Sequence, residues 1–240
     1  MDKFRVEVIA KTNNPQQLVW AAMHQDYSEN FVWDNRDRFP NEDKAGELIV
    51  KHLLAGNKGH YGCIEHPQIT FNVGYFPHSL MQQIRTHRIG FSFDVQSFRY
   101  TGKRIIDVVA GKIDIEDVFY LRPVGNYTNR QGKRYFYSPE QRDRDLKWCL
   151  DACKLYEEHI DAGMAEEQAR SIIPFDARQH FVMSCNARSL MHLLDLRWKK
   201  DAQLEAQKLC ELLYVHFEKW MPALAIWYKE NRAQKARLSP

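Results

Sequence analysis

The chain has 240 residues, of which 44% are hydrophobic and 27% charged, so it can bury a sizeable core and is not expected to be disordered. No apolar run approaches the roughly 18 residues of a membrane span, and the N-terminus lacks the apolar segment of a signal peptide; we therefore expect a cytoplasmic protein. A net charge of +3 is too small to require a nucleic acid as partner.

The first third of the chain is predicted to alternate strands and helices. Apolar residues alternate from Phe4 to Ala10 as in a half-buried edge strand, and Pro15 begins a predicted helix. A helical period over residues 41–55 predicts a second helix, and the alternation from Ile69 to Tyr75 predicts the clearest strand. A third helix is expected after Pro77. Its apolar face is expected to contain Leu80, Met81, Ile84 and Arg88.

The rest of the chain begins with a glycine-containing stretch over residues 89–136, which is expected to be mostly loop. Five elements are then predicted. They are a helix at 138–163, a short helix from 164 to before Pro174, a strand at 179–185, and two helices at 186–199 and 202–220. No repeat or convincing linker interrupts this pattern. We therefore expect one α+β domain over residues 1–240.

The five cysteines contain no CxxC pair, which fits neither a disulfide framework nor a zinc ribbon and predicts reduced thiols. The spacing of His60 and His66 matches no usual metal signature, so no metal is expected. Three polar clusters instead suit a phosphate or a heteroaromatic ring. They lie at residues 60–66, 82–100 and 186–197.

In the second cluster, Arg85 and Arg88 taken alone would be read as solvated charges on a helix. Arg88 continues an apolar face, however, and a cation in that position needs a partner, which a bound anion would supply. The chain contains no G-x-G-x-x-G, Walker or G-x-S-x-G element, so any dinucleotide must be held without a Rossmann turn.

A helical wheel of residues 186–199 separates a buried stripe from two polar borders. The stripe contains Ala187, Leu190, Met191, Leu194 and Trp198. One border holds Asn186 and Arg197, and the other holds Arg188, His192 and Asp195. Such borders are where a pocket wall would open, although charges that simply flank a core helix would give the same pattern.

Three blocks of the sequence, in a fixed order, complete the pattern of motifs. Thr86-His87-Arg88 is followed, after eight residues, by Ser97-Phe98-Arg99-Tyr100. A His-x4-Glu-His element precedes it at 60–66, and Ala-Arg-x-x-x-Pro with Asn-Ala-Arg-Ser-Leu-Met follows within 169–197. Together these blocks resemble the signatures of the flavin-dependent thymidylate synthases over about residues 60 to 200.

The resemblance implies a mixed sheet flanked by helices and a homotetramer with FAD at its subunit interfaces. It implies reductive methylation of dUMP to dTMP, with 5,10-methylenetetrahydrofolate as carbon donor and NADPH as reductant. The implied FAD-binding residues are His60, Glu65, Thr86, His87, Arg88, Asn186, Ala187, Arg188 and His192. The implied dUMP-binding residues are Gln82 or Gln83, Arg85, Gln96, Ser97, Phe98, Arg99, Arg170 and Arg197.

Arg197 matches the family's arginine that holds the uracil, and we interpret it as the catalytic residue. Uracil C5 becomes nucleophilic as negative charge spreads through the ring, and a fixed guanidinium stabilises that charge. Ser97 has no histidine base placed near it in the sequence, so a binding role is expected for it.

Three departures from the family signature affect the expected contacts, one of which is His192 in place of a common asparagine, although it can still donate a hydrogen bond. Thr86 stands where the first signature arginine is expected, which makes Arg85 the candidate to replace it. The following loop is one residue longer, and Val95 stands in place of the usual glutamate. Asp94 and Gln96 are the candidate substitutes. The alternative from another class is a non-enzymatic RNA-binding module that uses basic and aromatic residues at 98–104 and 130–137, although the RNP consensus is missing.

Overall fold

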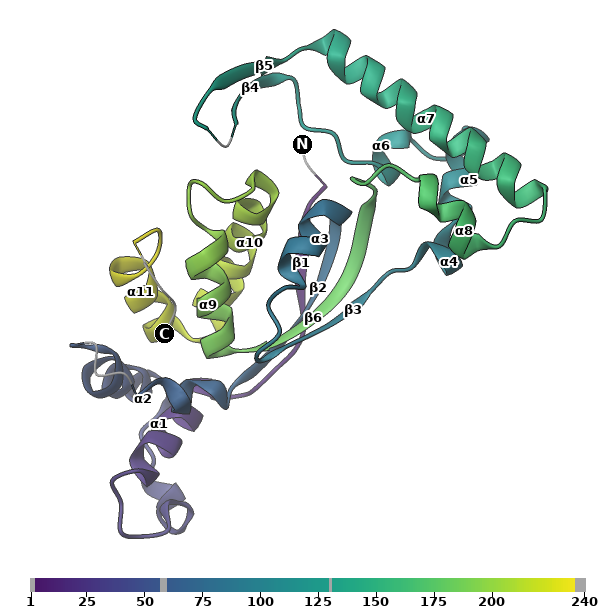
Figure 1. Cartoon of the computed structure of the whole chain (residues 1–240). Coiled ribbons are helices and arrows are strands. Elements are labelled where there is room, and N and C mark those ends of the chain that lie inside the picture. Colours follow the sequence, from purple (N-terminus) through teal and green to yellow (C-terminus); the bar gives the residue numbers. More distant parts are fainter. Residues whose placement is uncertain (1–2, 57–59, 130, 236–240) are drawn as a thin grey trace. The chain divides into compact units, whose positions relative to one another are not determined.

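The computed structural model describes residues 3–56, 60–129 and 131–235, and Figure 1 shows their strands and helices. A four-stranded sheet has the order β1-β2-β6-β3, and a separate hairpin pairs β4 with β5. The four strands are β1 (Arg5–Lys11), β2 (Gln68–Pro77), β3 (Phe91–Val95) and β6 (Arg178–Asn186). Helices and sheet therefore combine in the predicted α+β class.

Strand β1 lies at an edge of this sheet, as its alternating sequence predicted. Only Val6 of its seven residues is fully buried, because the edge strand covers the core with part of one face. The chain divides into two compact units, and boundaries between them fall inside β2, β3 and β6. One unit comprises Met1–Phe4, Gly74–Gln83 and Asp94–Phe181, and the other Arg5–Val73, Ile84–Phe93 and Val182–Pro240. The single domain over residues 1–240 stays a prediction.

The second of these units holds two groups of helices. Helices α9 (Ala187–Arg197), α10 (Leu204–Trp220) and α11 (Pro222–Asn231) pack one after another, as Figure 1 shows. Helix α1 (Pro15–Gln25) packs on α2 (Glu42–Ile49), which is capped by Asn41 and continues as a π turn, η2 (Val50–Leu54). The remaining elements are two 3₁₀ turns, η1 (Val32–Arg38) and η3 (Tyr61–Glu65).

The first unit is built around helix α7 (Pro139–Asp161), which begins with a capping box between Ser138 and Gln141. Cys149, Cys153 and Tyr156 of α7 form a buried cluster with Ile105 of helix α5 (Lys103–Val109). The other elements are α3 (His78–Ile84), α4 (Phe98–Thr101), α6 (Ile115–Val118), β4 (Gly125–Thr128), β5 (Arg134–Tyr137), α8 (Glu166–Ala169) and the 3₁₀ turn η4 (Arg170–Ile172).

Two expectations about the fold are wrong. Residues 89–136 are not mostly loop, because they contain β3, α4, α5, α6, β4 and most of β5. Most of these elements are four or five residues long, too short to show a clear period, and α5 is stabilised by packing against α7. Helix α3 ends at Ile84, so Arg88 does not continue its apolar face, whereas Leu80, Met81 and Ile84 are fully buried as predicted.

The five cysteines are free thiols and all are buried, which confirms the prediction of reduced cysteines. Burial raises the pKa of Cys149 to about 11, so this thiol stays protonated near neutral pH. None of the helices in the described residues is long and apolar enough to cross a membrane.

Candidate active site

The guanidinium of Arg197 is held by two residues that lie 110 and 111 positions earlier in the chain. Arg197 is in the last turn of α9, and its Nε donates a hydrogen bond of 3.0 Å to Nε2 of His87. Its Nη2 donates a second bond, of 3.2 Å, to Oγ1 of Thr86. The turn that follows α3 therefore fixes the plane of this guanidinium from two of its nitrogens.

His87 is a buried, neutral histidine at this site. Its side chain is only 6% exposed. Burial, the Arg197 cation and His192 together lower the pKa of His87 to about 4. Because Nε2 accepts the bond from Arg197, the ring proton is assigned to Nδ1. The imidazole thus orients Arg197 without adding or cancelling charge at neutral pH.

His192 and Arg188 extend this cluster along α9. The rings of His87 and His192 lie 5.4 Å apart between centroids. Nδ1 of His192 is buried and has no hydrogen-bond partner among the described residues. Nη1 of Arg188 forms an ion pair of 2.6 Å with Oε1 of Glu65, which joins the first and third predicted clusters.

The N-terminal end of α9 is fixed by its cap. The Asn186 side-chain oxygen accepts a hydrogen bond of 2.7 Å from the Ser189 N–H, while the Asn186 N–H donates to the Gly90 carbonyl. The Ala187 side chain is fully buried, and its N–H donates to the Pro67 carbonyl. Asn186 can therefore offer its amide NH2 to a ligand, whereas the Ala187 backbone donor is already used.

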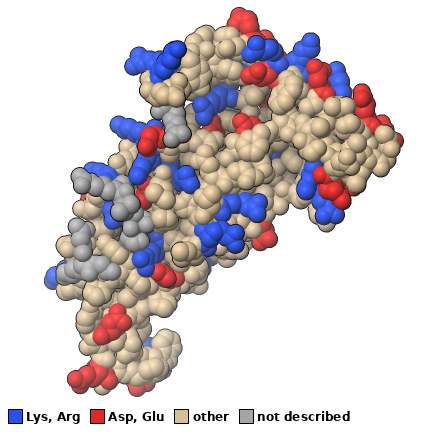
Figure 2. All heavy atoms as spheres, viewed as in Figure 1, with Lys and Arg blue, Asp and Glu red and all other residues tan. Residues whose placement is uncertain are grey.

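Arg85 and Arg88 lie in the turn beyond α3 and are exposed. Neither side chain forms a hydrogen bond or an ion pair within the part of the chain that the structure describes. On the face shown in Figure 2, basic side chains gather in small groups with acidic side chains between them. Small groups of this kind suit an anion of small-molecule size better than a long polyanion.

Most of the predicted dUMP-binding residues lie in the other unit. Nη1 of Arg170 donates a hydrogen bond of 3.1 Å to Oγ of Ser97, the residue that caps α4. Nε of Arg99 lies 3.6 Å from Oε2 of Glu167 in an exposed ion pair. The structure therefore joins Ser97 and Arg170 directly, whereas Arg99 is paired with Glu167.

The remaining predicted residues of that unit are tied to the protein itself. Gln82 Nε2 lies 2.6 Å from His78 Nε2, and Gln83 also has a partner in the described structure. Gln96 accepts a hydrogen bond from the His180 N–H. The Phe98 ring is partly buried, packs against the core and lies under the Arg104 guanidinium.

Sequence reasoning did not identify Arg178, which is 5% exposed in the same unit. Its Nη1 donates to the Tyr75 carbonyl at 2.7 Å, and its Nε donates to the Glu116 carbonyl at 2.8 Å. Together with Arg142, it lines a pocket of about 380 Å³. The position of Arg178 directly before the strand predicted at 179–185 was the signal that could have indicated it.

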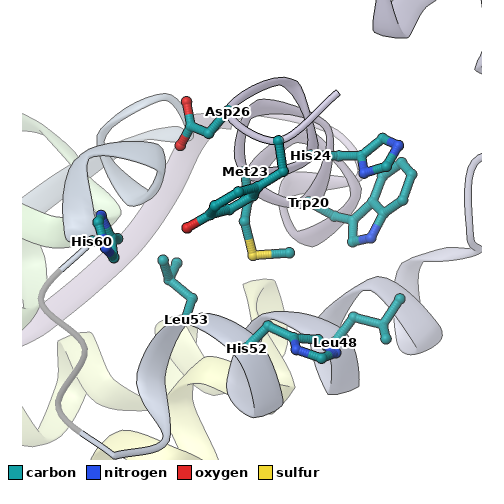
Figure 3. Close-up of a pocket in the computed structure, with 9 residues that line it drawn as sticks. Trp20, Met23, His24, Asp26, Leu48, His52, Leu53 and His60 are labelled. Atoms are coloured by element: carbon teal, nitrogen blue, oxygen red, sulfur yellow. The ribbon is translucent and has the colours of Figure 1, made fainter. Parts of the chain in front are cut away.

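His60 lies apart from the Arg197 cluster in the contacts described and lines a different pocket. This pocket has a volume of about 670 Å³ and lies between α1, α2 and the π turn η2, as Figure 3 shows. Asp195, which was predicted on the same helix border as His192, is buried and forms an ion pair of 2.7 Å with Arg232. We therefore assign Asp195 to the core and not to the ligand surface.

No group of three or more potential metal ligands occurs in the described residues.

Residues 7–223 match the family described as thymidylate synthase complementing protein. A flavin-dependent thymidylate synthase of Haloarcula marismortui is 32% identical over 251 residues, covering 98% of this chain and 99% of the relative. The chain belongs to the flavin-dependent thymidylate synthases. A relative with the same description from Halobacterium salinarum is 30% identical and covers 98% of this chain and 100% of its own.

Solved structures confirm the fold. The UMP/dUMP methylase PolB from Streptomyces cacaoi bound with 5-Br dUMP has a TM-score of 0.77 at 22% identity, covering 100% of this chain and 98% of that one. Thymidylate synthase X from Helicobacter pylori with FAD and dUMP has a TM-score of 0.68 at 19% identity, covering 92% and 99%. Membership of the family confirms the predicted enzyme class and FAD as its cofactor.

Proposed function

We propose that the chain methylates dUMP at C5 to give dTMP, with 5,10-methylenetetrahydrofolate as carbon donor and NADPH as reductant. The observation that carries this proposal is the fixed guanidinium of Arg197, held by the neutral imidazole of His87. A carboxylate in that place would orient the guanidinium equally well but would cancel its charge. The neutral acceptor leaves the full positive charge of Arg197 for an anionic pyrimidine.

The residues of this chain fit FAD as an anionic dinucleotide. Arg88 presents an exposed guanidinium with no partner in the described structure, and it suits a pyrophosphate. The buried, unpaired Nδ1 of His192 lies in the same unit and suits a polar group of a ring. When bound, the flavin supplies the redox chemistry, taking hydride from nicotinamide and passing electrons to the transferred carbon.

The protein's own part in the reaction is to bind, orient and stabilise charge. Arg197 would hold the pyrimidine and stabilise the negative charge that makes C5 nucleophilic. Ser97 and Arg170, joined by their hydrogen bond, would provide donors to the phosphate of dUMP, with Arg99 as an additional cation. Gln82 or Gln83 remain the candidates for further contacts to the nucleotide.

We further propose the predicted homotetramer, with FAD between subunits. All nine predicted FAD-binding residues lie in one unit, whereas the predicted dUMP-binding residues are divided between the two units. The chain also lacks a self-contained dinucleotide loop. If the proposal holds, dilution to the monomer releases the flavin; a monomer that keeps stoichiometric FAD contradicts it.

The function is tested with the purified protein. It should carry the yellow absorbance near about 450 nm that flavins give. After anaerobic reduction with NADPH, the flavin should be reoxidised only when dUMP and 5,10-methylenetetrahydrofolate are both present, with dTMP as product. A colourless protein that binds single-stranded RNA in a salt-sensitive manner would support the RNA-binding alternative instead.

A further inference from the structure

Arg104 is a half-buried cation that does not belong to the predicted nucleotide-binding residues. It is the second residue of α5, which packs on α7, while the preceding α4 packs on α8, as Figure 1 shows. Between α4 and α5, Gly102 lies so close to α7 that a Cβ there would overlap the Tyr156 hydroxyl. This close approach fixes the position of the segment that carries both Ser97 and Arg104.

Two contacts hold the guanidinium of Arg104 in place. Its Cζ lies 4.6 Å from the centroid of the Phe98 ring, which is a cation–π contact. Its Nη2 donates a hydrogen bond of 2.6 Å to the carbonyl of Arg178 in β6. Phe98 directly follows Ser97 in the sequence. The guanidinium therefore lies beside the segment that presents the Ser97 hydroxyl.

No carboxylate matches the charge of Arg104 within the part of the chain that the structure describes. Its Nε is buried and has no hydrogen-bond acceptor there. Its Nη1 also lacks a hydrogen bond to the described residues, and it is not enclosed as Nε is. Burial lowers the pKa of Arg104 to about 10, so the side chain is still charged at neutral pH. A cation that has lost water without gaining a carboxylate is stabilised by a bound anion.

The neighbouring side chains add donors to this place. Burial and the Arg104 cation lower the pKa of His180, so its imidazole is neutral at neutral pH and does not repel an anion. Nη1 of Arg170 donates to Oγ of Ser97 at 3.1 Å, and this is the one side-chain hydrogen bond of Arg170 to the described residues. Two guanidiniums with unused N–H groups thus lie at Ser97 and at the adjacent Phe98.

We propose that Arg104 binds the phosphate of dUMP, as a third donor side chain beside Ser97 and Arg170. This inference rests on the proposed function. A phosphate monoester has three strongly accepting oxygens, so it can accept from one hydroxyl and two guanidiniums at once, whereas a carboxylate has two. Arg99, the other cation near Ser97 in the sequence, already pairs with Glu167.

The test compares two ligands of the FAD-loaded protein by calorimetric titration: dUMP, and deoxyuridine, which lacks only the phosphate. Arg104→Gln should weaken dUMP binding by at least about tenfold, because a charged hydrogen bond is lost. Deoxyuridine binding should stay nearly unchanged. FAD content and the rate of flavin reduction by NADPH without dUMP should also not change.

Two further variants separate the contact from a general effect of the substitution. The matched control is Lys103→Gln, which removes the charge of the adjacent exposed residue, whose Nζ pairs with Asp107. This control should bind both ligands as the wild type does. Arg104→Lys keeps the charge but not the planar guanidinium, so it should retain part of the preference for dUMP over deoxyuridine. It can also replace Arg104→Gln if that variant does not fold, because an ammonium also forms a cation–π contact with Phe98.

Several results would overturn the assignment. Equal weakening of both ligands by the Arg104 variants would show that Arg104 acts through Phe98 on the shape of the site. Unchanged dUMP affinity in Arg104→Gln, or the same loss in Lys103→Gln, also contradicts the phosphate contact, and loss of FAD would assign Arg104 to the cofactor. If the wild type forms dTMP while Arg104→Gln binds dUMP normally, this inference alone fails. If the wild type binds dUMP through Arg104 but forms no dTMP, the proposed function alone fails.

Discussion

Nε2 of His87 accepts a hydrogen bond from Nε of Arg197, and the two residues are 110 positions apart. The bond joins the turn after α3 to the last turn of α9 within one compact unit. Its consequence is a cation whose position is fixed by a neutral group, because burial and the neighbouring Arg197 lower the pKa of His87 to about 4.

The first prediction concerns pH. The unfolded chain binds a proton at His87 below its usual pKa of 6.5, whereas the folded chain does so only near about 4. The free energy of unfolding should therefore be at its full value above pH 6.5 and fall as the pH drops towards 4, by on the order of 1–3 kcal/mol from this residue. His87→Gln should make the dependence shallower. Denaturant unfolding of both proteins between pH 4 and 7.5 measures this, and equal slopes would contradict it.

A second prediction concerns the role of Arg197 in the substrate half of the reaction. Arg197→Ala should leave FAD bound and let NADPH reduce the flavin, because that step does not involve dUMP. Formation of dTMP should fall by about 10²–10³, the usual loss for one fixed donor to developing charge. Arg197→Lys should retain only part of the rate of dTMP formation, since lysine lacks the planar, two-pronged guanidinium. The two half-reactions are measured in the same anaerobic sample. Equal slowing of both, or loss of flavin, would assign Arg197 to the fold or the cofactor.

A third prediction uses the neighbouring residues Arg85 and Thr86. Arg85 is exposed, so it is available to replace the missing signature arginine. Arg85→Ala should weaken dUMP binding by about 1.5–3 kcal/mol, the range for a charged hydrogen bond. Thr86→Val removes only the neutral hydroxyl that accepts a hydrogen bond from Arg197, and it should weaken dUMP binding by about 0.5–1.5 kcal/mol. Thr86→Ser should bind dUMP nearly as the wild type does. Titration of dUMP distinguishes the two, and equal small effects would remove the case for Arg85.

A fourth prediction compares two glycines with the same backbone conformation. Gly90 has φ +71°, and a Cβ there would overlap the Ser189 side chain and lie 2.5 Å from Nδ2 of Asn186. Gly111 has φ +65° with no atom within 4 Å of the added carbon. Gly111→Ala should lower the free energy of unfolding by about 1–2 kcal/mol, the cost of the left-handed conformation alone. Gly90→Ala should cost a further roughly 1–3 kcal/mol from overpacking and should weaken FAD binding.

Thermal or denaturant unfolding with a flavin titration checks both glycine variants. Equal destabilisation of the two, with normal FAD affinity in Gly90→Ala, would show that the Asn186–Ser189 cap tolerates displacement. The comparison separates backbone strain from steric overlap, because strain is present at both positions and overlap only at one.

Local signals in the sequence were sufficient for the long elements. The Asn41 cap, the Ser138 cap with Pro139 and the alternation at 69–75 all correspond to observed element boundaries or strands. The short elements between 89 and 136 were missed because four-residue helices have no measurable period and rely on tertiary packing. Helix α11 (Pro222–Asn231) was also not predicted.

Only part of the candidate site could be predicted from the sequence. The wheel of residues 186–199 placed Arg197 at a border, but no spacing rule relates it to His87 or predicts that the imidazole is neutral. That property comes from burial and from charges brought together by folding. The same holds for Arg178, whose two carbonyl partners come from distant segments. The π turn at Val50–Leu54 is hidden by a regular helical sequence pattern.

The most direct test is carbon transfer itself. The FAD-loaded protein is incubated anaerobically with dUMP, NADPH and 5,10-methylenetetrahydrofolate that carries ¹³C in its methylene group, and the nucleotide product is analysed by mass spectrometry and NMR. The account predicts dTMP with the label in its 5-methyl group, in an amount that depends on FAD and NADPH. Failure of the flavin-loaded, NADPH-reducible protein to form dTMP, or dTMP without the label, would contradict it.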